Sequence, residues 1–263
     1  LYEPLSGVAD LLHVSLLQGT KAYGVHIEPL AVPVRERDPR HDHENFYCLQ
    51  EDSLREQAAG SSWSWTILRP QVIYGEAQGG NMNALPALGV YAALLRAGGE
   101  PLHYPGGAPS VSEAVDADLV AAMLTWAATS PAAANETFNI TNGDVYTLRN
   151  VWPVLAESFG MDVGDDVPLS LTEEMPAREE AWGEIVRRFD LVAPSSLAAF
   201  VGQSFVYADL MLGCGRTEPR PPSLVSTIKA RKAGFTDCVD TEDMFRRLIG
   251  RLQAERLLPP RSW

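Results

Sequence analysis

The amino-acid sequence predicts an α/β protein with a parallel sheet in its first part and a mostly helical second part. Short apolar runs alternate with helical stretches over residues 1–160, which is typical of βα units in a parallel sheet. Residues 161–263 contain mainly helical patterns. We therefore expect two parts, residues 1–160 with the sheet and residues 161–263 as a helical lobe.

Apolar runs of strand length occur four times in the first part. We assign strands to residues 11–18, 63–69, 71–74 and 138–140. The run at 11–18 ends before Gly19 and is apolar enough for a strand buried in a parallel sheet. Trp63, Trp65 and Ile67 alternate with small polar residues, which is the period of a strand.

Helices are predicted between and after these strands. They are assigned to residues 46–59, 84–97, 110–129, 148–159 and 181–212, the last interrupted at Pro194, with two short helices inside 223–258. Asn45 can cap the first helix, because its side chain can accept a hydrogen bond from the first turn. Ser110 and Glu113 have the spacing of a capping box, so we place the third helix start at Ser110. Residues 28–45 are expected to be a loop, and the acidic, proline-containing residues 162–180 a surface connection.

The charge balance excludes some classes of partner. The chain has 21 Lys and Arg against 34 Asp and Glu, a net charge of −13 at pH 7. This charge repels nucleic-acid phosphates and anionic membrane surfaces, so we expect neither as a partner. No apolar stretch has the length of a membrane span, and we recognise no secretory signal. Three widely spaced cysteines also favour a reducing, cytoplasmic location.

Two kinds of ligand motif are missing from the sequence. No glycine-rich phosphate-binding motif follows any predicted strand. His41 and His43 flank Asp42, but alternate residues in a charged loop are usually solvated, so we expect no metal site. The chain also begins at Leu1 without an initiator Met, which is consistent with a fragment or a shortened gene product.

A lysine and a tyrosine are candidates for proton chemistry. Lys21 follows the first predicted strand, and ligands of open α/β sheets bind beyond the carboxyl ends of strands. Tyr47 lies at the start of the next helix. A nearby cation lowers the pKa of a phenol from about 10, and the phenol can donate a hydrogen bond or a proton to a substrate oxygen. The alternative is a solvated lysine and a half-buried tyrosine that anchors the helix.

Several segments together resemble the progesterone 5β-reductase/iridoid synthase-like family, a group of atypical extended short-chain dehydrogenases/reductases. These segments are GTKAYG at 19–24, NFYCLQED at 45–52, WSWTILRPQVIYG at 63–75, NMN at 81–83 and WAATSPAAANETFNITNGD at 126–144. The likeness is dense from about residue 10 to 160 and looser from about 205 to 260. It implies the C-terminal part of an NAD(P)-binding Rossmann-type sheet with a helical substrate lobe. It also implies NADPH-dependent reduction of the activated C=C bond of an enone or enal.

The resemblance also implies roles for individual residues. Lys21 and Tyr47 match the catalytic pair. Ordinary short-chain dehydrogenases carry Tyr-x-x-x-Lys on one helix, whereas the fourth residue after Tyr47 is Glu51. Ile27 matches a position that lines the substrate pocket. The residues that match cofactor contacts are Ile73, Gly80, Asn81 and Met82.

Three departures from the family leave alternatives open. Cys48 replaces a second tyrosine, and Gly80-Asn81 replaces Ser-Met of plant members. The family's first βα units, which carry the glycine-rich motif, are expected to lie ahead of Leu1. The chain is then either a reductase or a truncated, non-catalytic remnant, and half a sheet favours self-association through its open edge. A third alternative, an NAD-dependent epimerase or dehydratase, is disfavoured because Tyr-x-x-x-Lys is absent.

Overall fold

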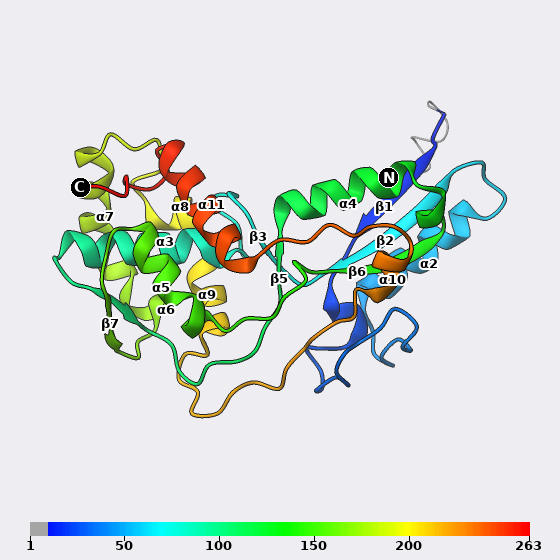
Figure 1. The fold of residues 1–263 in the computed structure, drawn as a ribbon, viewed down its shortest axis with the longest axis horizontal. Helices are drawn as coiled ribbons and strands as arrows, with labels where there is room; N and C mark the ends of the chain where they lie inside the picture. Colours follow the sequence, from blue (N-terminus) through cyan, green and yellow to red (C-terminus); the bar gives the residue numbers. More distant parts are fainter. Residues whose placement is uncertain (1–9) are drawn as a thin grey trace. The chain divides into compact units, whose positions relative to one another are not determined.

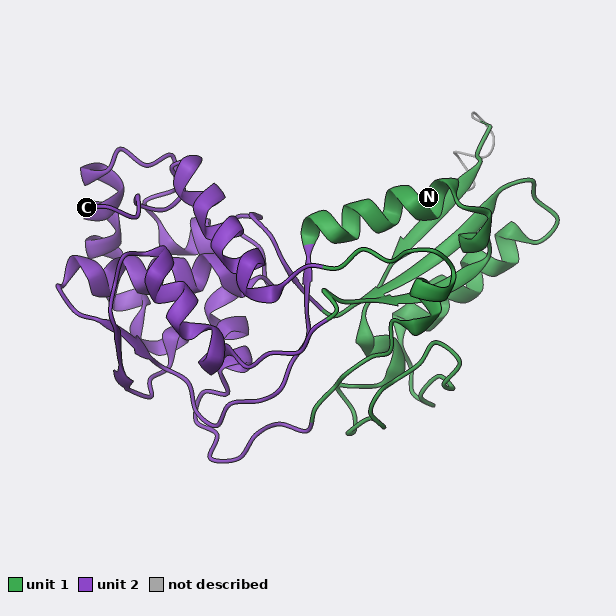
Figure 2. Ribbon diagram, in the orientation of Figure 1, with its two compact units in different colours: residues 1–71, 117–143, 222–238 green, residues 72–116, 144–221, 239–263 purple. Residues whose placement is uncertain are grey.

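The computed structural model describes residues 10–263, so the first nine residues of the expected sheet-containing part lie outside the described residues. The chain forms two compact units, each assembled from three stretches of sequence (Figure 2). Unit 1 contains residues 1–71, 117–143 and 222–238, and unit 2 contains residues 72–116, 144–221 and 239–263. The expected division at residue 160 stays a prediction.

Unit 1 is built on a three-stranded parallel sheet in the order β1-β2-β6 (Figure 1). The strands are β1 (His13–Leu17), β2 (Ser64–Pro70) and β6 (Glu136–Ile140). His13 pairs with Ser64, and Thr66 pairs with Glu136. The predicted parallel α/β fold is confirmed, and all three strands end at the same edge of the sheet. β1 is an outer strand of this order, and self-association through a sheet edge stays a prediction.

Helices and short 3-10 turns complete unit 1. They are η1 (Thr20–Tyr23), α2 (Phe46–Ala58), α4 (Ala117–Thr129), η2 (Pro131–Ala133) and α10 (Ile228–Lys232). Leu54 of α2 is fully buried in a cluster with Val14, Trp63 and Ile67. This cluster holds α2 against the sheet, because removing apolar surface from water is the main stabilising contribution. The predicted helix after Asn45 is confirmed.

A long loop, residues 24–45, connects η1 to α2. Val34 in this loop forms a parallel bridge with Val225, and both side chains pack with the ring of Tyr23. The middle of the loop is therefore bound to the segment that precedes α10. The loop begins at the end of η1 and finishes at the start of α2.

Unit 2 is mostly helical and contains two short pairs of parallel strands. β3 (Val72–Tyr74) pairs with β5 (Ala114–Asp116), and β4 (Leu102–Tyr104) pairs with β7 (Val163–Asp166). The helices are α3 (Ala84–Ala97), α5 (Leu148–Ser158), α6 (Leu171–Glu174), η3 (Pro176–Arg178), α7 (Glu179–Arg188), α8 (Leu197–Val201), α9 (Ser204–Leu212) and α11 (Thr241–Ala254). Trp152, Trp182, Phe200 and Phe245 are among its fully buried side chains.

One local prediction was wrong. The capping box at Ser110 does not start a helix, because residues 114–116 pair with β3 and α4 begins only at Ala117. The Ser110 hydroxyl instead accepts a hydrogen bond of 2.8 Å from the backbone N–H of Arg220. At Ser110, tertiary pairing thus decided the structure over a local sequence signal. The predicted surface connection at residues 162–180 contains β7 and α6.

Within residues 10–263, no helix is both long and apolar enough to cross a membrane.

Candidate active site

The proposed catalytic residues lie at the carboxyl end of the unit 1 sheet. β1 ends at Leu17, and the chain passes through Gln18 and Gly19 into η1, which carries Lys21. After the loop, α2 begins at Phe46 and carries Tyr47 in its first turn. The carboxyl ends of parallel strands are the usual location of ligand sites in open α/β sheets.

Two hydrogen bonds join the two segments, and a third caps the helix. The side-chain amide of Asn45 donates to the carbonyl oxygen of Lys21 at 2.7 Å, and its oxygen accepts from the backbone N–H of Tyr47 at 3.0 Å. The buried side chain of Gln18 donates to the carbonyl oxygen of Tyr47 at 2.9 Å. Asn45 and Gln18 therefore position the segments of Lys21 and Tyr47 relative to each other. Sequence reasoning identified Asn45 only as a helix cap and missed Gln18.

The Tyr47 hydroxyl lies beside Gly19. The position that a Cβ atom would take on Gly19 is 3.8 Å from the Tyr47 oxygen and 3.6 Å from the carbonyl oxygen of Pro70. The missing side chain leaves space next to the hydroxyl. Tyr47 is half-buried, and burial raises the pKa of its phenol above 10. The phenol is therefore neutral at physiological pH and able to donate a hydrogen bond.

The expected effect of Lys21 on Tyr47 was wrong. Lys21 is exposed, and within residues 10–263 no hydrogen bond joins its ammonium to the Tyr47 hydroxyl. Burial, and not a neighbouring cation, governs the pKa of Tyr47. The charge of Lys21 acts on His26 instead. The pKa of His26 is lowered by burial first and then by the positive charges of His43, Lys21 and His41.

Glu51, four residues after Tyr47, belongs to a buried ion-pair network. Its side chain is 1% exposed and pairs with Arg69 at 2.5 Å, Arg40 at 2.8 Å and Arg55 at 3.1 Å. Burial alone would raise the pKa of Glu51, but the three cations outweigh it and hold the pKa below its ordinary value.

Arg69, which the sequence motif identifies only as part of a strand end, connects α2 to the sheet. Its guanidinium carbon lies 4.6 Å from the centre of the Tyr23 ring, while its Nη2 atom binds Glu51. The Tyr23 hydroxyl donates to the side chain of the fully buried Asn139 at 2.7 Å. These contacts run from α2 through β2 and η1 to β6, so they hold α2 against the sheet.

The predicted cofactor contacts all belong to unit 2, whereas Ile27 belongs to unit 1. Ile73 is half-buried in β3 opposite Val115. The carbonyl oxygen of Gly80 accepts a hydrogen bond of 2.9 Å from the Ser204 hydroxyl, which holds that loop.

The loop of residues 80–82 presents an open surface. A Cβ atom on Gly80 would meet nothing within 4 Å, and Met82 is 57% exposed. Ile27, the predicted pocket residue, is 52% exposed. Exposed apolar side chains and an open backbone of this kind fit contact with an apolar or planar ligand group, and these roles stay predictions.

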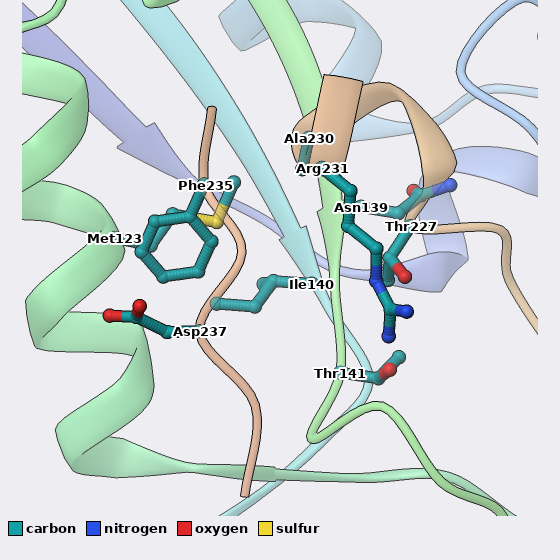
Figure 3. A pocket seen from close by; sticks show the side chains of 9 residues that line it. All are labelled: Met123, Asn139, Ile140, Thr141, Thr227, Ala230, Arg231, Phe235 and Asp237. Atoms are coloured by element: carbon teal, nitrogen blue, oxygen red, sulfur yellow. The ribbon is translucent and has the colours of Figure 1, made fainter. Parts of the chain in front are cut away.

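A small cavity lies in unit 1 at the end of β6 (Figure 3). Figure 3 shows the Arg231 side chain pointing toward Thr141, with Met123 and Phe235 beside Ile140. Its volume of about 10 Å³ is enough for about one water molecule. The cavity is therefore too small to be the substrate pocket.

A family profile assigns the fold. The profile of the PRISE-like Rossmann-fold domain matches residues 5–191. The chain belongs to the PRISE-like Rossmann-fold family. The family expected from the sequence segments is thereby confirmed.

Curated proteins of the PRISE group resemble this chain over nearly its whole length. It is 34% identical to the (S)-8-oxocitronellyl enol synthase of Antirrhinum majus over 264 residues, which covers 95% of this chain and 66% of that enzyme. It is 32% identical to the 3-oxo-Delta(4,5)-steroid 5-beta-reductase of Arabidopsis thaliana, with 95% and 65% covered. The PRISE chain thus spans about two thirds of the length of these relatives.

Solved structures confirm the Rossmann-type fold of the PRISE chain. The structure of RMD from Pseudomonas aeruginosa complexed with NADPH matches with a TM-score of 0.60 and 13% identity, covering 94% of this chain and 68% of that one. At this identity the likeness shows the fold alone.

Proposed function

We propose that the protein is an NADPH-dependent reductase of the activated C=C bond of an enone or enal. The relatives at 32–34% identity are an enol synthase and a steroid 5-beta-reductase, which supports a small carbonyl-containing substrate. The observation that carries the proposal is the pair of bridges, Asn45 to Lys21 and Gln18 to Tyr47, at the carboxyl end of the sheet. The absence of a side chain at Gly19 also leaves room beside the Tyr47 hydroxyl for a substrate oxygen, which a tyrosine with a structural role alone does not need.

The loop of residues 80–82 is suited to contact the nicotinamide end of the cofactor. The open backbone at Gly80 and the exposed side chains of Asn81 and Met82 are available to a planar ring, with Ile73 nearby in sequence. A bound nicotinamide supplies a hydride to the β-carbon of the conjugated system. The residues that would hold the pyrophosphate are not assigned, because no glycine-rich turn joins a strand to a helix in residues 10–263.

The protein's own residues act at the substrate carbonyl. Negative charge grows on the carbonyl oxygen as the β-carbon is reduced. The neutral phenol of Tyr47 donates a hydrogen bond to this oxygen, and the exposed ammonium of Lys21 adds electrostatic stabilisation. Because the Tyr47 phenol keeps its proton, the proton that reaches the α-carbon comes from water.

Replacing Tyr47 tests this assignment. Tyr47→Phe is expected to lower kcat by about 10²–10³-fold while the NADPH dissociation constant stays unchanged, since one preorganised donor is lost. Leu49→Ala, at an exposed position of the same helix, is the matched control and is expected to keep full activity. Equal kcat values for Tyr47→Phe and the unmodified protein would remove Tyr47 from the mechanism.

A titration of NADPH fluorescence separates the reductase from a non-catalytic remnant. Saturable binding at micromolar NADPH supports the reductase. An absence of binding in the folded protein would contradict it and support the remnant.

A further inference from the structure

Three histidines of the loop form one continuous chain of ring contacts. His41 Nδ1 lies 3.0 Å from His43 Nδ1, and His43 Nε2 lies 3.2 Å from His26 Nε2. The rings meet edge to face, with centroids 4.8 Å apart for His41 and His43 and 5.0 Å apart for His26 and His43. At the far end, His41 Nε2 lies 3.3 Å from Glu28 Oε1. We call His26, His41 and His43 the histidine chain.

The histidine chain can hold only a limited number of protons. Each nitrogen-to-nitrogen contact needs one hydrogen, because two N–H groups repel and two bare nitrogens do not bond. Three neutral rings supply the three hydrogens that the two contacts and the Glu28 contact use. One further proton fits on the free Nδ1 of His26. A second further proton has to enter one of the two contacts and break it.

The histidine chain contacts the first residue of the loop. Gly24, the first residue after η1, has φ of +85°, and a Cβ atom placed there would lie 2.7 Å from Cβ and Cγ of His41. The His41 ring therefore packs directly on the backbone of Gly24. These contacts bring the start of the loop, Gly24 and His26, against its end, His41 and His43.

We propose that the histidine chain is a pH-sensitive latch that holds the loop between Lys21 and Tyr47 closed at neutral pH and opens on acidification. The latch opens when the second extra proton breaks a ring contact. An open loop no longer holds the end of η1 close to the start of α2. We expect reductase activity to fall as a result, and this expectation rests on the proposed function.

The proton count sets the direction of the switch. Burial first, and then the positive charges of His43, Lys21 and His41, lower the pKa of His26. Glu28, from the loop, faces His41. An open loop takes up the second extra proton without losing a ring contact, whereas the closed loop cannot. The closed state is therefore favoured above the ordinary histidine value of about 6.5 and is lost as the pH falls.

A shared metal ion is a poor alternative occupant. His43 uses its two nitrogens for two different partners, so the three rings do not converge on one point. In the part of the chain that the structure describes, no group of three or more His, Cys, Asp or Glu is arranged to hold a metal.

Hydrogen exchange of the folded protein, without cofactor or substrate, tests the latch. Protection factors of amides in residues 24–45, corrected for chemical exchange rates, are measured at about pH 7.5 and about pH 5. We expect a loss of about tenfold in protection at the lower pH in the unmodified protein. In His43→Gln, whose side chain cannot take up a proton, we expect the same protection at both values. His103→Gln, which removes a histidine of unit 2, is expected to keep the full pH dependence.

Two results would overturn the latch: unchanged loop protection between the two pH values, or an undiminished pH dependence in His43→Gln. If circular dichroism shows that His43→Gln is not folded, His43→Asn, which likewise cannot take up a proton, replaces it with the same expected outcome. Because the readout needs no turnover, failure of the latch and failure of the reductase proposal are seen separately.

Discussion

The side-chain amide of Asn45 donates a hydrogen bond of 2.7 Å to the carbonyl oxygen of Lys21. The oxygen of the same amide accepts a hydrogen bond from the backbone N–H of Tyr47. One asparagine thus fixes the start of α2 and ties it to the residue that follows the sheet. Asn45 is therefore both the helix cap and a contact between η1 and α2.

Two variants of Asn45 separate its role as the cap of α2 from its contact with Lys21. Asn45→Ala loses both functions, and we expect the free energy of unfolding to fall by about 1 kcal/mol or more. Asn45→Ser keeps a capping oxygen but cannot donate to Lys21, so we expect nearly normal stability with reduced kcat. Urea unfolding and steady-state NADPH oxidation check both. Full activity in Asn45→Ser would show that the Lys21 contact is not needed.

The raised pKa of Tyr47 predicts a basic limb in the activity profile. The phenol is a donor only while protonated, so kcat is expected to be constant through neutral pH and to fall above about pH 10. Lys21→Arg keeps a positive charge at that pH and is expected to retain the same limb. If the pH at which kcat falls is different in Lys21→Arg, the basic limb belongs to the lysine and not to Tyr47.

Glu51→Gln is expected to destabilise the protein by about 3–5 kcal/mol, because it leaves the buried Arg69 without a counter-charge. The Glu51 pKa is below its ordinary value of 4.5 in the folded state, so its stabilising contribution is present above that pH and is lost as the pH falls. The variant is therefore expected to show a weaker loss of stability in acid. Asp52→Asn, 61% exposed, is the control and is expected to cost less than about 1 kcal/mol.

Alanine substitutions at two glycines with similar φ angles separate the cost of backbone strain from the cost of a steric contact. Gly24 and Gly60 have φ of +85° and +77°, but a Cβ on Gly60 would meet nothing within 4 Å. Gly60→Ala is expected to cost about 1 kcal/mol for the left-handed backbone alone. Gly24→Ala is expected to cost clearly more, because rotation of the His41 ring cannot relieve a contact with its Cβ. Equal costs in thermal unfolding would contradict the packing of His41 on Gly24.

Gly19→Val tests the space beside the Tyr47 hydroxyl. The backbone of Gly19 is extended, with φ of 177°, so any residue can adopt it. The added methyl groups reach toward the hydroxyl and are expected to lower kcat/KM by about tenfold or more, which is about 1.4 kcal/mol in the barrier. Unfolding stability is expected to change little, since the Cβ contacts are ordinary. Gly19→Ala is the intermediate control.

Much of the sheet-containing unit follows from local patterns. The apolar run ending at Gly19, the alternation from Trp63 and the cap at Asn45 each correspond to an element of the structure. Ser110 and Glu113 misled because a capping box is defined by spacing alone, whereas pairing of residues 114–116 with β3 depends on a segment distant in sequence.

The candidate site was only partly predictable. Motif segments identify Lys21 and Tyr47, but the partial burial of Tyr47 and the hydrogen bond from Gln18 arise from packing of α2 on the sheet. The histidine chain likewise brings together His26 and His43, which lie on opposite sides of a loop whose path no periodicity reveals.

The position of Glu51 limits which residue the chain can carry there. Its carboxylate pairs with three arginines at the position where ordinary short-chain dehydrogenases carry their helix lysine. A lysine at this position would place a fourth cation beside the buried Arg69 and remove its counter-charge. The usual helix lysine is therefore incompatible with this packing unless Arg69 or its neighbours change as well.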